Sequence, residues 1–115
     1  MSLLSDLKTI INTLNIPVET GVFSGEAPSE YIVLVPIYDS FELYADDFPE
    51  QDVQSVRISL FTKNNYSRTK KALLKAILAA GVSVASRQYI GFETDTKYHH
   101  YNIDVENLYN TEDLK

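Results

Sequence analysis

The apolar residues of this chain change their spacing along the sequence, from a helical repeat to the two-residue repeat of strands and back. Over about residues 3 to 14 they recur with the 3.6-residue period of a helix that has one apolar side. Ser2 is a suitable N-cap, and Asn15 can end the helix in the left-handed conformation, with Pro17 just beyond. Because such a helix must bury its apolar side, we expect it to lie on a sheet. The apolar side consists of Leu3, Leu4, Leu7, Ile10, Ile11 and Leu14.

A second helix is predicted from about Tyr66 to Ala80, where the helical period returns. Asn64 or Asn65 caps its start, and Gly81 stops it. Three basic residues spaced i, i+3 and i+7 share one face of this helix, and a fourth basic residue flanks them. They are Arg68, Lys71 and Lys75, with Lys70 as the flanking residue. The apolar side holds Tyr66, Leu73, Leu74, Ile77 and Leu78.

Three or four strands are predicted before the second helix from composition and alternation. A short strand or extended segment is expected around residues 18–23. Tyr31–Ile37 is apolar on both faces, which favours a position in the middle of a sheet, and Pro36 places a break in hydrogen bonding near its end. Residues 38–52 alternate with a period of two and form either an edge strand or a hairpin arm with an acidic turn. The clearest strand is Val53–Thr62, in which Val56, Ile58 and Leu60 face opposite to Ser55, Arg57, Ser59 and Phe61.

Two further strands follow the second helix, at about Val82–Phe92 and Tyr98–Glu106, and the polar residues 93–97 join them as a hairpin. Simple alternation places Val82, Val84, Ile90 and Phe92 on one face of the first of these strands. In the second, the inner face holds His99, Tyr101, Ile103 and Val105, and the outer face holds His100, Asn102, Asp104 and Glu106.

The order α-β-β-β-α-β-β predicts an α+β fold, with a mainly antiparallel sheet of four or five strands and both helices packed on one face. A chain of 115 residues is long enough for one core, so we expect a single domain over residues 1–106. Residues 107–115 are too polar to bury much, and we expect a frayed C-terminal tail or a short loose helix there.

Composition excludes several classes of protein. The chain has no Cys, so it has no disulfide framework, thiolate metal site or cysteine nucleophile. It has no apolar run of the length that spans a membrane, so no membrane partner is expected. The segment Met1–Asp6 lacks the basic and apolar regions of a signal peptide, and we expect assembly inside a cell. A net charge of −6 argues against non-specific DNA binding.

The charges are strongly segregated along the sequence. Between Lys8 and Arg57 lie nine acidic residues and no basic one, and from Arg57 to Phe92 lie seven basic residues and no acidic one. Two interpretations stay open, namely solvated faces of no further consequence, or a two-signed surface that meets another copy head to tail. On the second interpretation the candidate subunit interface consists of Glu42, Asp46, Asp47, Arg68, Lys70, Lys71 and Lys75.

A search for chemical motifs nominates no catalytic, cofactor-binding or metal-ligating residue, so we expect a protein without a cofactor that is not an enzyme. His99 and His100 would point to opposite faces of a strand and could not share an ion. The segment Gly21–Gly25 matches neither a phosphate loop nor a nucleophile elbow. The acidic residues 46–52 lack the spacing of a calcium loop.

The eight tyrosines are numerous for this length. Tyrosine is enriched at protein interfaces, and it also suits half-buried strands, so both interpretations stay open. The basic helix over residues 66–80, with Tyr66 and Tyr89 near it, supports an alternative function as a small nucleic-acid- or ligand-binding regulatory module.

Three segments of the chain resemble small proteins from the morphogenesis modules of long-tailed phages and prophages. They are Pro28–Pro36, Val53–Tyr66 and Tyr89–Val105, and the most specific part is Tyr-Ile-Gly-Phe-Glu-Thr-Asp-Thr-Lys-Tyr-His-His-Tyr at residues 89–101. The family comprises tail-completion, head–tail joining and tail-terminator (neck) proteins, and the resemblance covers about residues 1–106.

The resemblance implies a structural virion-assembly protein with an α+β fold and no catalytic motif. It implies an oligomer, typically a hexameric ring, that contacts tail-tube or connector proteins at the virion neck or tail end after assembly in the bacterial cytoplasm. Nucleic acid is expected only as DNA that passes through the ring.

Overall fold

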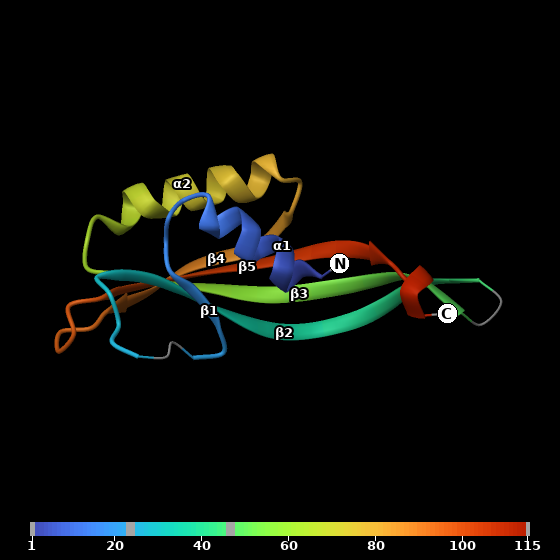
Figure 1. Ribbon diagram of the computed structural model, residues 1–115, viewed down its shortest axis with the longest axis horizontal. Coiled ribbons are helices and arrows are strands. Elements are labelled where there is room, and N and C mark those ends of the chain that lie inside the picture. The colour runs from blue at the N-terminus through green and yellow to red at the C-terminus, as the bar shows by residue number, and fades with distance from the viewer. Residues whose placement is uncertain (1, 23–24, 46–47, 115) are drawn as a thin grey trace.

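The protein forms one five-stranded sheet with two α-helices on one of its faces (Figure 1). The computed structural model describes residues 2–22, 25–45 and 48–114. The α+β class and the order α-β-β-β-α-β-β are confirmed. The elements are α1 (Leu3–Asn12), β1 (Val18–Thr20), β2 (Glu30–Ala45), β3 (Phe48–Thr62), α2 (Tyr66–Ala79), β4 (Ser83–Phe92), β5 (His99–Asn110) and the short 3₁₀ helix η1 (Glu112–Leu114).

The strand order across the sheet is β1-β2-β3-β5-β4. The pair β1–β2 is parallel, and the pairs β2–β3, β3–β5 and β4–β5 are antiparallel. The apolar residue Ile58 of the central strand β3 stands between Leu34 of β2 and Ile103 of β5. This register places three large apolar side chains in a row beneath the helices, and it matches the alternation predicted for β3.

Local sequence signals explain where the helices begin and end. The Ser2 hydroxyl accepts a hydrogen bond from the Ser5 backbone N–H at 3.2 Å, so the predicted N-cap of α1 is confirmed. Asn15 is left-handed as predicted, with a φ of 59°, but the helix itself ends at Asn12 with Thr13 as its C-cap, before the predicted end at Leu14. The Asn65 side chain accepts hydrogen bonds from the first turn of α2. The Leu3 N–H donates to the Gln54 side chain at 2.8 Å, which ties the start of α1 to β3.

The core lies between the two helices and the sheet face beneath them. Leu7 and Ile11 of α1 and Leu73 and Ile77 of α2 have no exposed surface, and they pack on fully buried residues of β2, β3 and β5. Burying an aliphatic side chain of this size contributes roughly 1.5–3 kcal/mol. The fully buried apolar residues of these strands are Ile32, Leu34, Ile58, Leu60, Ile103 and Val105.

Residues 38–45 and 48–52 form a hairpin arm, which is one of the two structures that the alternation over residues 38–52 allowed. β2 and β3 pair from Glu30 with Thr62 out to Ala45 with Phe48, and in Figure 1 they extend well beyond the helices along the long axis. The molecule measures 54 × 27 × 24 Å. We call residues 38–45 and 48–52 the arm. The sequence suggested that β2 ends near Pro36. Instead, a bulge at Ile37 absorbs the break in pairing, and the strand continues.

Simple alternation failed in β4. Register shifts occur between Val84 and Ser86 and between Tyr89 and Gly91, so the strand contains two bulges. Each bulge inserts one residue, so the side chains that follow it switch to the opposite face of the sheet. Ile90 therefore does not share the face of Val84, and its side chain is exposed. Tyr89 takes the inner position opposite Tyr101. The parity predicted for β5 is confirmed, because Tyr101, Ile103 and Val105 are buried.

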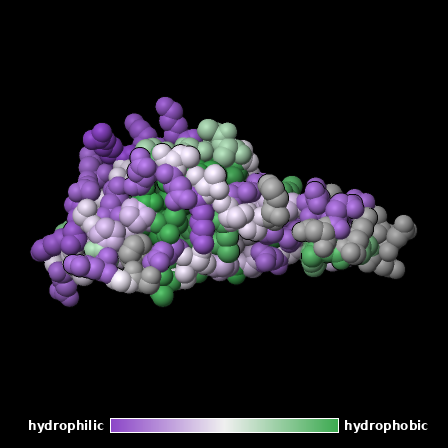
Figure 2. Space-filling view, viewed as in Figure 1, coloured by the Kyte–Doolittle hydropathy of each residue, from purple (hydrophilic) through white to green (hydrophobic). Residues whose placement is uncertain are grey.

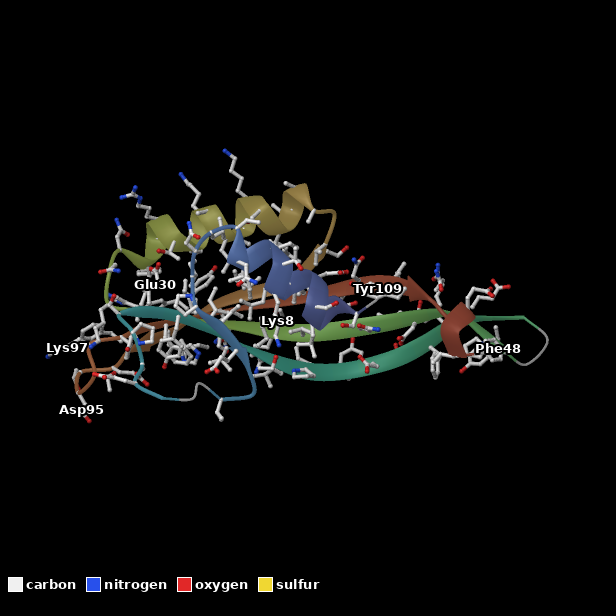
Figure 3. All side chains as sticks on the ribbon, viewed as in Figure 1. Lys8, Glu30, Phe48, Asp95, Lys97 and Tyr109 are labelled. Carbon is white, nitrogen blue, oxygen red and sulfur yellow. The ribbon has the colours of Figure 1, made fainter. Side chains whose placement is uncertain are left out.

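The expected C-terminal tail contributes to the folded structure. β5 continues past Glu106 to Asn110, paired with β3. The Tyr109 hydroxyl donates to Asp6 on α1 at 2.5 Å, and the buried Thr111 hydroxyl donates to the Pro49 carbonyl at 2.5 Å. Figure 3 shows Tyr109 on the helix side of the sheet and Phe48 on the arm. The sequence predicts a frayed tail or a short loose helix from residue 107. Residues 107–110 instead continue β5, because polar tips on these side chains satisfy hydrogen bonds while their remaining atoms pack, and the short 3₁₀ helix η1 follows at Glu112–Leu114.

Candidate subunit interface

The arm presents aromatic side chains to solvent. Tyr38, Glu42 and Tyr44 alternate along β2 and pair with Ser55, Gln51 and Pro49, so they share one face of the hairpin. Tyr38 is 53% exposed and Tyr44 is 64% exposed. Large aromatic side chains left in water on an extended hairpin are typical of a surface that meets another protein.

The arm is also acidic. Asp39, Glu42 and Glu50 are exposed, and the sequence places no basic residue anywhere in the arm. The Asp52 carboxylate accepts a hydrogen bond from the Gln54 side chain at 2.8 Å. Two residues predicted to be at the interface, Asp46 and Asp47, lie outside the described residues. The arm therefore combines aromatic surface with charge of a single sign.

A groove of about 520 Å³ runs along α2 and reaches β4. Its apolar surface comes from Leu74 and from Leu78, which is 60% exposed. Its rim is basic. We call this site the α2–β4 groove, and its lining residues are Ser67, Lys70, Lys71, Leu74, Lys75, Leu78 and Arg87.

The basic residues predicted on α2 differ in their surroundings. Lys71 and Lys75 are exposed and line the groove. The Lys70 ammonium lies 5.2 Å from the Tyr101 ring centroid and 5.7 Å from that of Tyr66, so it is partly held by cation–π contacts. Arg68 is exposed on α2 and is not among the groove residues. Figure 2 shows hydrophilic side chains over α2, and Figure 3 shows nitrogen-tipped side chains that project from this helix.

Sequence reasoning missed Arg87 as a member of this site. It lies opposite Ile103 on the helix side of the sheet because the first bulge of β4 changes the parity. A bulge carries no clear local sequence signal here, so pattern alone could not place this side chain. The Tyr38 and Tyr44 pair could have been found, since both residues follow the two-residue repeat through Glu42.

The acidic and basic parts of the predicted interface lie on separate regions of the molecule. Glu42 is on the arm, where it lines a small surface pocket with Glu106 and Leu108. Lys71 and Lys75 are on α2, above the covered end of the sheet (Figure 1). Among the described residues of the predicted interface, Glu42 is therefore not paired with Lys71 or Lys75 of its own chain, and both surfaces stay available for contact with another molecule.

The sheet face opposite the helices carries a polar ladder and an aromatic cluster. Arg57 donates to both oxygens of Asp104, at 2.9 and 3.0 Å, and Ser59 donates to Asn102 at 2.9 Å. The hydrogen bond to Asp104 raises the pKa of Arg57 further above its ordinary value. Next to this ladder, a groove of about 360 Å³ lies between the sheet and the loop after β1. It is lined by Gly21, Val22, Ala27, Tyr31, Val33, Val35, Ser59 and Phe61.

The two histidines point to opposite faces of β5, as alternation predicts. The His99 ring lies 5.1 Å from the Tyr66 ring on the helix side, and its Nδ1 is 2.9 Å from the Tyr89 hydroxyl. The His100 ring stacks on Phe61 at 4.2 Å on the other side, where burial lowers its pKa. They cannot ligate one ion together.

Within the described ranges, no three His, Cys, Asp or Glu side chains are grouped so that they could hold a metal ion. In the same residues, no helix is both long and apolar enough to cross a lipid bilayer. Comparison of the sequence with protein-family models gives no match, and comparison with curated proteins also gives none.

Proposed function

We propose that this chain is a structural assembly subunit of a phage or prophage particle, which completes the tail or joins the head to the tail as part of a ring. The observation that carries the proposal is that one small molecule has two complementary surfaces on separate regions. One is the acidic, aromatic arm with Tyr38, Glu42 and Tyr44, and the other is the basic α2–β4 groove. The resemblance of three sequence segments to neck and tail proteins supports a phage particle, and its neck or tail end, as the place of assembly.

Two different surfaces that fit each other favour heterologous contact, in which each copy uses one surface toward the copy before it and the other toward the copy after it. Such contacts form a closed ring when the rotation from one copy to the next is a whole fraction of a full turn. A hexameric ring, as in the family that the sequence resembles, meets this condition. The same rim charges can meet tail-tube or connector proteins. DNA would pass through such a ring without specific contacts.

Deletion of the gene from an inducible prophage, followed by electron microscopy of the lysate, tests this function. Tails of uncontrolled length would support tail termination or completion, and separate heads and tails would support joining. Infectious particles of normal shape and number from the deletion strain would contradict the proposal. Complementation with the wild-type gene controls for effects on neighbouring genes.

A nucleic-acid- or ligand-binding regulatory role is the second candidate, and the basic rim of the α2–β4 groove favours it. The Tyr66 and Tyr89 rings near the groove are 4.9 Å apart and pack on each other, which leaves less of their faces for stacking on bases. A mobility-shift titration with DNA and RNA at low and high salt separates the two candidates. Phosphate contacts are strongest at low salt, so absence of binding there would remove this candidate.

A further inference from the structure

We infer that the arm of one copy docks into the α2–β4 groove of the next copy, with Tyr38 and Tyr44 as aromatic anchors and Glu42 facing Lys71 and Lys75. This inference rests on the proposed assembly function and specifies which parts of neighbouring subunits meet. The partner is therefore a second copy of this chain, and the contact is head to tail.

The two surfaces have similar lengths. Tyr38 and Tyr44 are six residues apart on an extended strand, which corresponds to about 20 Å at ~3.3 Å per residue. The groove extends along α2 from Ser67 to Leu78, eleven residues of helix, which corresponds to about 16 Å at ~1.5 Å per residue. One strand of the arm can therefore lie along the groove with both tyrosines near its ends.

The chemistry of the two surfaces is also matched. Leu74 and Leu78, with the aliphatic stems of the groove lysines, offer apolar surface to tyrosine rings, while each phenolic hydroxyl can stay at the wet rim. Between the rings, the Glu42 carboxylate would face the exposed ammonium groups of Lys71 and Lys75. Because the arm is acidic and the groove basic, arm–arm and groove–groove contacts are repulsive, which favours the head-to-tail arrangement.

The arm cannot reach the groove of its own chain. β3 of the arm pairs with β5 as far as Gln51 opposite Asn110, and the Thr111 hydroxyl holds the Pro49 carbonyl. These contacts keep the arm in line with the sheet, and Figure 1 shows it directed away from α2 along the long axis. The contact must therefore form between two copies.

Site-directed cross-linking of the full chain tests the inference, because the natural chain has no Cys. Ser40 lies on the same face of the arm as the two tyrosines, and Ser67 lines the groove, so Ser40→Cys and Ser67→Cys introduce thiols with little change in volume. Mixing the two variants with a short bismaleimide should give a covalent dimer that contains one chain of each kind.

A matched pair supplies the control. Val22 is 78% exposed just after β1, at the sheet edge opposite β4, so Val22→Cys offers an accessible thiol far from the groove. The Ser40→Cys and Val22→Cys mixture should give only the background of random collisions. Adding Lys71→Glu and Lys75→Glu to the Ser67→Cys chain should abolish the dimer, and Lys→Arg at both positions should retain it.

A yield from the arm–groove pair no greater than that from the Val22→Cys control would overturn the inference, as would a yield unaffected by the charge reversal. Loss of the dimer when a DNA oligonucleotide is added at low salt would assign the groove to nucleic acid and also overturn it. The proposed function has a separate test, because particle assembly in the deletion strain does not depend on which surfaces meet.

Discussion

The helix-covered end and the arm are built from the same two strands, but they differ in what their apolar residues contact. At the covered end, Ile32, Leu34 and Ile58 have no exposed surface and pack beneath α1 and α2. On the arm, Tyr38 and Tyr44 on the same β2 strand are mostly in water. The two strands stay paired on both sides of the bulge at Ile37, and this bulge puts Tyr38 and Tyr44 on the sheet face opposite the helices, where neither helix covers them.

The two regions have different roles, since the covered end stabilises the fold and the arm is available for association. A core that is complete without the arm can fold and leave the arm free to bind. The arm is nevertheless held in shape, since β5 and Thr111 support its base. Aromatic surface presented on a supported hairpin loses little conformational freedom when it docks, which favours affinity.

The largest expected effect is a difference in the free energy of unfolding between substitutions of two leucines of α2. Leu73 has no exposed surface, so Leu73→Ala should lower the free energy of unfolding by about 2–5 kcal/mol. Leu78 lies in the groove, so Leu78→Ala should change this free energy by less than about 0.5 kcal/mol and weaken self-association instead. Urea unfolding followed by circular dichroism measures the first effect. Equal losses of stability in the two variants would mean that the groove is part of the core.

Truncation of an anchor on the arm should affect association alone. Loss of an aromatic anchor at an interface costs about 2 kcal/mol of binding free energy, so Tyr44→Ser should weaken self-association roughly thirtyfold. Its unfolding midpoint should stay within the range of a surface substitution. Val22→Ser, at an exposed apolar residue just after β1, is the matched control and should change neither. A fall in the unfolding midpoint of Tyr44→Ser would show that the arm stabilises the fold.

The contact between Tyr109 and Asp6 should contribute a smaller amount, at the junction between the two regions. Tyr109→Phe removes a hydrogen bond to a carboxylate and should cost about 1–2 kcal/mol. Burial, followed by this hydrogen bond, raises the pKa of Tyr109 above its ordinary value of 10.0. The folded state thus favours the neutral phenol, so its contribution is complete below pH 10 and is lost as the pH rises further. Unfolding at pH 8 and pH 11 should show a steeper loss in the wild type than in Tyr109→Phe.

The ion pair on the open face should contribute least. The Arg57 side chain is 45% exposed, and exposed pairs contribute about 0–1 kcal/mol. A double-mutant cycle of Arg57→Ala and Asp104→Ala should give a coupling energy in that range, reduced at high salt. A coupling well above 1 kcal/mol would indicate that this face is shielded from solvent, for example by a partner.

The sequence pattern predicted the elements that depend on nearby residues. Ser2 and Asn65 cap the N-termini of the helices as their types suggest, Asn15 adopts the left-handed conformation in the turn after α1, and the period of two along Val53–Thr62 predicted the correct buried face of β3. What it could not give were features that depend on distant pairing. The bulges of β4 and the extension of β5 to Asn110 arise from register against neighbouring strands, which no local window contains.

In the candidate site, too, the residues set by local spacing could be predicted and those set by distant strand pairing could not. The basic face with Lys71 and Lys75 was readable from helical spacing, because it lies on a single helix. The inclusion of Arg87 needed the β4 bulge, and the separation of Glu42 from the lysines needed the length of the arm.

Charge-driven contact between copies can be measured by sedimentation velocity of the wild-type chain and the Lys71→Glu/Lys75→Glu variant, over a range of protein concentrations at low and high salt. We expect the wild type to form larger species at low salt, and these species to be lost both in the variant and at high salt. Larger species that persist unchanged in the variant and at high salt would contradict this expectation, because the segregated charges would then be solvated surface only.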